Sequence, residues 1–145
     1  MAFQDELGVI RWRLHLRSAP TEVRQALTTP EGRAAYWAES AEEVNGVIDV
    51  RILNYPPYMG QVLDSTDETF SVEHFGTIVT STWQTSTDGG TILTMRCAVD
   101  DEAARAEMTA GWVSVLLALK AAVDFGVDLR NHEPELSWAQ GSAGN

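Results

Sequence analysis

Residues 103–126 read AARAEMTAGWVSVLLALKAAVDFG and predict one long amphipathic helix. Apolar side chains recur there at steps of three and four, which places them on one stripe of a helix. The acidic residues just before the stretch suit the positive N-terminal end of a helix, and Gly126 suits its end. The stripe consists of Met108, Trp112, Val115, Leu116, Leu119, Ala122 and Val123.

The residues before this helix alternate between apolar and polar side chains, as in strands of an antiparallel sheet. In residues 9–17 the apolar face contains Ile10, Trp12 and Leu14, and the other face is basic. Pro20 and Pro30 mark the starts of two short helices, and about six strand patterns follow. The order predicts an α+β fold: a curved antiparallel sheet of about six or seven strands wrapped on one long C-terminal helix.

One domain is expected over residues 1–145, with an ordered core at about 7–134 and a tail at 135–145. The last six residues, 140–145, read as frayed. Residues 128–132 are polar, and they either cap one end of the sheet or mediate self-association as a homodimer.

The composition excludes several classes of partner and site. A net charge of −11 argues against binding to nucleic acid and to anionic membranes. No apolar run is expected to span a bilayer, because Lys120 and Asp124 interrupt the most apolar stretch. The start of the chain lacks signal-peptide features, so a cytoplasmic location is expected. The single cysteine, Cys97, excludes an internal disulfide, and no spacing typical of a metal or cofactor site occurs.

Three motifs and their order resemble those of a known superfamily. The motifs are Ser18-Ala-Pro-Thr-Glu-Val23 with Ala26-Leu-Thr-Thr-Pro-Glu31 and Tyr36-Trp37; Gly89-Gly90-Thr91 leading into Ile92-Leu93-Thr94-Met95; and Gly111-Trp112 followed by residues 116–120. This pattern resembles the START-like, helix-grip superfamily (SRPBCC), and within it the bacterial homologues of the heat-shock protein 90 ATPase activator. The chain departs from it in the loop at residues 54–58 and in lacking a Gly-Tyr pair after Trp138, which leaves the docking of the tail open.

The resemblance implies an apolar cavity between the sheet and the long helix. A filled core without a cavity is the alternative. Gly111 either lets a ligand approach the helix or allows close packing of helix on sheet. The expected lining is Trp12, Trp37, Tyr58, Phe70, Val72, His74, Trp83, Met95, Cys97, Met108, Gly111, Trp112, Val115, Leu116 and Leu119.

His74 is the one candidate for chemistry. It shares a strand face with Phe70 and Val72, so it points inward, where it either binds a ligand, acts as acid or base, or is a satisfied core residue. The leading hypothesis is a module that binds a small apolar molecule without catalysis. The alternatives are a cyclase or dehydratase that uses His74, and a stress-related protein-interaction domain of the co-chaperone kind.

Overall fold

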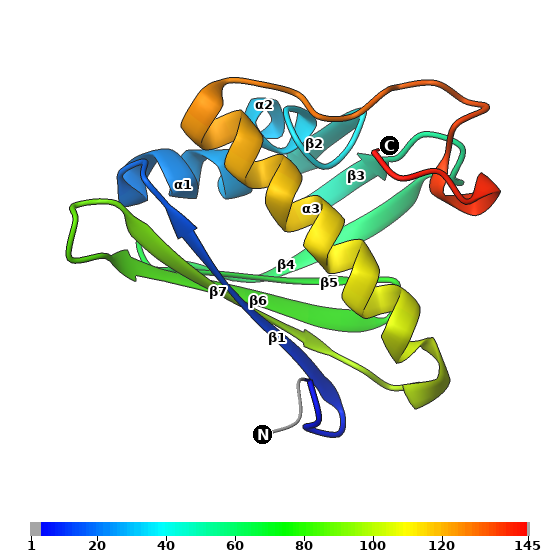
Figure 1. The fold of residues 1–145 in the computed structure, drawn as a ribbon, viewed down its shortest axis with the longest axis horizontal. Helices are drawn as coiled ribbons and strands as arrows, with labels where there is room; N and C mark the ends of the chain where they lie inside the picture. Colours follow the sequence, from blue (N-terminus) through cyan, green and yellow to red (C-terminus); the bar gives the residue numbers. More distant parts are fainter. Residues whose placement is uncertain (1–3, 145) are drawn as a thin grey trace.

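The computed structural model describes residues 4–144. A seven-stranded antiparallel sheet curves around one long helix, and two short helices close one end (Figure 1). The strand order is β1-β7-β6-β5-β4-β3-β2, which confirms the α+β helix-grip prediction. The strands are β1 (Val9–Leu16), β2 (Ser40–Val44), β3 (Val47–Arg51), β4 (Tyr58–Ser65), β5 (Thr69–His74), β6 (Thr77–Thr85) and β7 (Thr91–Ala98). The helices are α1 (Pro20–Thr28), α2 (Pro30–Ala34), α3 (Arg105–Phe125) and the 3₁₀ turns η1 (Glu102–Ala104) and η2 (Trp138–Gln140).

Alternation sets which face of each strand meets the helix. In β1, Ile10 and Leu16 are fully buried, while the basic side chains between them are exposed. The outer basic side chains pair with acidic groups near the ends of the strand, Arg11 with Glu6 at 3.1 Å and His15 with Asp88 at 2.8 Å. The predicted inward and outward faces of this strand are confirmed.

Asp124 fastens the C-terminal end of α3 to the chain between β1 and α1. Its buried carboxylate accepts hydrogen bonds from the backbone N–H groups of Arg17 and Ser18, from the Ser18 hydroxyl at 2.7 Å and from Lys120 at 2.9 Å. Burial alone would raise the pKa of Asp124, but these donors outweigh it and lower the pKa to about 2. Arg17 therefore turns toward α3 instead of continuing the outer basic stripe.

The prediction that no apolar run is long enough to span a bilayer is wrong for the long helix. The segment Glu102–Phe125 is long and apolar enough to cross a membrane, with a mean hydropathy of 1.4. Lys120 and Asp124 both lie in this segment and pair with each other at 2.9 Å. One face of α3 packs on the sheet and contributes Leu116 and Leu119 to the core. The other face is exposed, for example at Leu117.

The tail after α3 is held by polar contacts. The Arg130 guanidinium donates to the carbonyl groups of Ala34 and Ala38, at 2.5 and 2.9 Å, and pairs with Asp128. His132 lies between Glu39 and Asp128, 2.7 Å from an oxygen of each. The tail therefore docks without the tyrosine that the resemblance led us to expect.

The predicted fraying of residues 140–145 is not observed over the described part of the tail. Ser137 is buried and begins η2, and the N–H of Asn131 donates to the carbonyl of Gly144 at 2.7 Å. Asn145 lies outside the described residues. This hydrogen bond closes residues 131–144 into a loop.

Candidate ligand cavity

A cavity of about 530 Å³ lies between the N-terminal half of α3 and the ends of β4, β5 and β7. It reaches the surface, because several of its lining side chains, including Phe75 and Trp138, are half exposed. Its volume falls within the rough range of 300 to 1,000 Å³ that ligand pockets occupy. The lining residues are Trp37, Ile52, Tyr58, His74, Phe75, Thr77, Cys97, Ala98, Asp100, Asp101, Glu107, Met108, Gly111, Trp112, Ser114, Val115 and Trp138.

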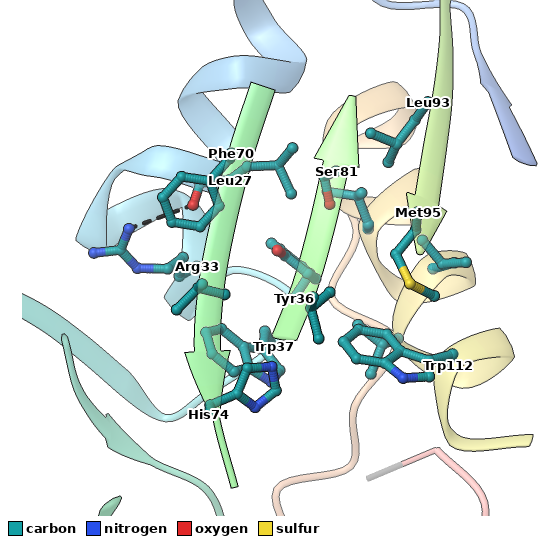
Figure 2. Close-up of a pocket in the computed structure, with 15 residues that line it drawn as sticks. Leu27, Arg33, Tyr36, Trp37, Phe70, His74, Ser81, Leu93, Met95 and Trp112 are labelled. Atoms are coloured by element: carbon teal, nitrogen blue, oxygen red, sulfur yellow. Dashed lines mark hydrogen bonds between the residues drawn. The ribbon is translucent and has the colours of Figure 1, made fainter. Parts of the chain in front are cut away.

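A smaller chamber of about 50 Å³ lies deeper between the sheet and α3. Figure 2 shows its residues, with His74, Trp37 and Trp112 at one end and Leu93 near the other. Trp37, His74, Trp112 and Val115 line both spaces and form the wall between them. A volume of this size holds a few water molecules at most, so the outer cavity is the one of ligand size.

Most of the side chains that the sequence analysis assigned to the lining lie at one of these two spaces. Trp37, Tyr58, His74, Cys97, Met108, Gly111, Trp112 and Val115 line the outer cavity. Phe70, Val72, Met95, Leu116 and Leu119 line the inner chamber.

Trp12 and Trp83 line neither space. Trp83 is 5% exposed and belongs to the core, and Trp12 packs against that core from the edge strand β1. Alternation predicts which face a side chain occupies, but it does not predict how far along the strand a cavity extends.

His74 sits in the wall between the two spaces and is surrounded by rings. Its ring centroid lies 5.6 Å from that of Trp37, 6.0 Å from that of Tyr58 and 6.2 Å from that of Trp112. The side chain is 7% exposed, and burial lowers its pKa to about 4, so it is neutral at pH 7. The inward orientation expected for His74 is observed.

The Nδ1 atom of His74 is buried and has no hydrogen-bond partner among residues 4–144. The hydroxyl of Tyr58, another residue that lines the outer cavity, is likewise buried and unpaired within that range. Burial raises the pKa of Tyr58, so it keeps its proton. Each buried polar atom without a partner costs about 1 to 3 kcal/mol, so a polar group on a bound molecule would recover part of that free energy.

Gly111 opens space in the cavity. A Cβ atom added there would meet no other heavy atom within 4 Å. Of the two explanations for this glycine, close packing of helix on sheet is therefore wrong. Met108 and Val115 lie three residues before and four residues after it on the same helix face, and both line the cavity.

Several lining residues were not predicted from the sequence. Phe75 has a positive φ of 53° and is followed by Gly76 at 72°, which makes a tight turn between β5 and β6. The turn carries the aromatic ring to the cavity mouth, 3.9 Å from the ring of Tyr58. Gly76 after a strand pattern was the available signal for this turn.

Arg33 was also missed, and it is 1% exposed. It lines the inner chamber, and its guanidinium donates to the carbonyl group of Leu27 (Figure 2). The guanidinium also donates to the carbonyl group of Ala41 and lies 3.4 Å from Glu43. Burial lowers its pKa, which Glu43 partly offsets. These contacts join α2 to α1 and to β2.

Solved structures with the same architecture are numerous. The protein SSP2350 from Staphylococcus saprophyticus has a TM-score of 0.74 at 20% identity, with 84% of this chain and 96% of that chain covered. The Aha1 dimer from Colwellia psychrerythraea has a TM-score of 0.71 at 21% identity, with 81% and 97% covered.

The chain has the START-like helix-grip fold. DynU16, described as a putative protein in the dynemicin biosynthetic locus, shares the helix-grip fold with a TM-score of 0.75 at 16% identity, and 85% of this chain and 49% of that chain are covered. No protein-family model matches the chain. No curated protein sequence matches it either.

Proposed function

We propose that this protein is a binding module for a small, largely apolar molecule, and that the outer cavity holds it without catalysis. The observation that carries this proposal is a cavity of about 530 Å³ with an aromatic wall and a buried, unpaired His74 Nδ1. An apolar body would gain roughly 25 cal/mol for each Å² removed from water. The unpaired polar atoms would orient it.

A ligand screen by thermal shift and native mass spectrometry tests this function. Neutral polycyclic aromatics and single-chain lipids are the first probes. We expect a subset to raise the melting temperature and to remain bound in the gas phase. Gly111→Leu places a side chain in the cavity and should abolish both effects, while Ala110→Leu, on the exposed face of the same helix, should not. Equal behaviour of the two variants would contradict the proposal.

A cyclase or dehydratase is the second candidate, and the inward His74 is the observation that favours it. A pKa near 4 makes His74 a weak base at neutral pH, because catalytic groups work best with a pKa near the working pH. Binding therefore fits the geometry better. Turnover of a bound polyketide or hydroxy compound that disappears in a folded His74→Gln variant would instead support the enzyme.

We also propose a cytoplasmic location and a homodimer formed through the outer face of α3. Leu117 is 51% exposed there and Leu129 of the tail is 53% exposed, and a groove of about 220 Å³ lies between them. Sedimentation equilibrium would show a dimer that Leu117→Glu returns to a monomer; a monomer at all concentrations would end this proposal.

A co-chaperone role is the third candidate. A pull-down against heat-shock protein 90 at micromolar concentration tests it, and recovery of no chaperone would remove it.

A further inference from the structure

The cavity mouth carries charge of one sign only. Asp100, Asp101 and Glu107 line it, and among the described residues no lysine or arginine does. Asp101 accepts the N–H of Ala103 at 3.0 Å, and Glu107 accepts the indole N–H of Trp138 at 3.1 Å. A carboxylate that accepts one hydrogen bond keeps its full charge and most of its accepting capacity. The mouth thus favours a positive group and disfavours a negative one.

The positive charges near the mouth do not neutralise these three carboxylates. The start of α3 and η1 contributes about half an elementary charge, which three carboxylates outweigh. Arg105 pairs with Glu102 and donates to backbone carbonyl groups near the N-terminus, including that of Val9. Arg33 borders only the inner chamber and is bound to its own neighbours.

Aromatic rings continue inward from this acidic mouth. Trp37, Tyr58, Phe75, Trp112 and Trp138 all line the cavity. Ring faces attract cations by about 0.5 to 2 kcal/mol. His74, whose Nδ1 is unpaired, lies in the wall between this cavity and the inner chamber. The site therefore combines an acidic mouth, aromatic walls and an unpaired histidine at the side of the inner chamber.

We infer that the preferred ligand is an aromatic amine with a hydroxyl at its far end. The ammonium lies among Asp100, Asp101 and Glu107, and the hydroxyl reaches His74. Carboxylate and phosphate ligands, including fatty acids, are disfavoured. This inference rests on the proposed binding function and adds the charge of the ligand to it.

Three probes with one ring system test the inference: 6-(aminomethyl)-2-naphthol, 6-(hydroxymethyl)-2-naphthol and 6-hydroxy-2-naphthoic acid. Isothermal titration calorimetry at low salt should show the amine binding about tenfold more tightly than the acid, with the neutral diol between them. 2-Naphthylmethylamine, which lacks the phenolic hydroxyl, should bind several-fold more weakly than the first probe, because it leaves His74 Nδ1 unpaired.

Two double variants distinguish the effect of carboxylates at the cavity mouth from the effect of the overall net charge on ligand binding. Asp100→Asn with Glu107→Gln should remove most of the preference for the amine. The control, Asp67→Asn with Glu68→Gln, changes net charge equally in an exposed turn outside the cavity lining and should leave the preference intact. Equal affinity for all three probes, or tighter binding of the acid, would overturn the inference while the binding function stands. Binding of none of them, together with a negative ligand screen, would overturn both.

Discussion

Trp138 of the tail donates its indole N–H to the carboxylate of Glu107 on α3, at a distance of 3.1 Å. Both residues line the outer cavity, so this hydrogen bond joins the end of the chain to the mouth. The side-chain amide of Asn54 also holds the tail, through the carbonyl of Pro134. The tail therefore closes one side of the cavity entrance.

Trp138→Phe should speed exchange at this entrance. The variant keeps an aromatic ring but loses the donor, so we expect about 1 kcal/mol or less of lost stability and a several-fold faster ligand dissociation. Hydrogen exchange of residues 137–144 and stopped-flow dissociation measure the two effects. Phe125→Leu, on an exposed side chain outside the cavity, is the control. An unchanged dissociation rate would show that the tail does not gate the cavity.

Gly111→Ala should stabilise the protein. Alanine in a helix interior is better than glycine by about 0.5 to 1 kcal/mol, and its Cβ would meet no neighbour here. Urea unfolding measures the gain. Gly126→Ala is the contrasting variant, because Gly126 has a positive φ of 66° that alanine adopts only with strain. A loss of stability at Gly111 would mean that the position is closely packed.

Asp124→Asn should destabilise the fold by about 2 to 3 kcal/mol at pH 7, because buried hydrogen bonds to a charge are lost. The pKa of this carboxyl is lowered from 3.8 to about 2, so its contribution is complete above pH 4 and is lost as the pH falls toward 2. Unfolding curves of wild type and variant should converge over that range. Parallel curves would contradict the pKa assignment.

His74→Phe should remove a pH dependence of stability. The pKa of His74 is lowered from 6.5 to about 4, so the unfolded chain binds the additional proton between these values. Wild type should therefore lose stability as the pH falls from 6.5 to 4, by roughly 3 kcal/mol at most, and the variant should not. At pH 7 the variant should be equally or more stable, because the unpaired Nδ1 is gone. A histidine that titrates near 6.5 by NMR would contradict burial.

His132 should titrate in the opposite direction. Its hydrogen bonds to Asp128 and Glu39 raise its pKa above 6.5. Its contribution to tail docking is complete below pH 6.5 and is lost as the pH rises through the raised value. The side chain is 39% exposed, so the effect stays below about 1 kcal/mol. The protection factors of residues 128–136, in which the base catalysis of exchange is divided out, should fall between pH 6 and 8, and His132→Gln should remove that fall; protection factors that stay constant in the wild type would refute the prediction.

The sequence predicted the architecture because most strands, β1 and β7 among them, alternate between buried and more exposed side chains. The alternation in β1 and the helical spacing from Met108 to Leu119 both survive in the structure. The inward orientation of His74 was also predicted, because the alternation within one strand is enough to show which of its side chains share a face. The position of a cavity depends instead on how completely side chains from several elements fill one volume. Trp12 and Trp83 were misplaced for that reason.

Other features depend on contacts between distant segments. Arg33 is buried because carbonyl groups of Leu27 and Ala41 converge on it, and no local pattern signals this. Residues 140–145 looked frayed because they are polar and rich in small residues, yet the carbonyl of Gly144 accepts the N–H of Asn131. The position of the preceding segment was left open, and there Arg130 binds carbonyl groups more than 90 residues earlier in the chain. Local propensity cannot register such long-range hydrogen bonds.

At Gly111 the volume of the cavity and the thermal stability of the protein make opposite demands on the residue type. Side chains with good helix propensity, such as alanine or leucine, would strengthen α3 at this position and reduce the volume left for a ligand. A search for heat-resistant variants should therefore select substitutions at residue 111 early, and the survivors should have lost their ligand. Natural retention of glycine under growth at high temperature would be a direct sign that occupancy matters to the organism.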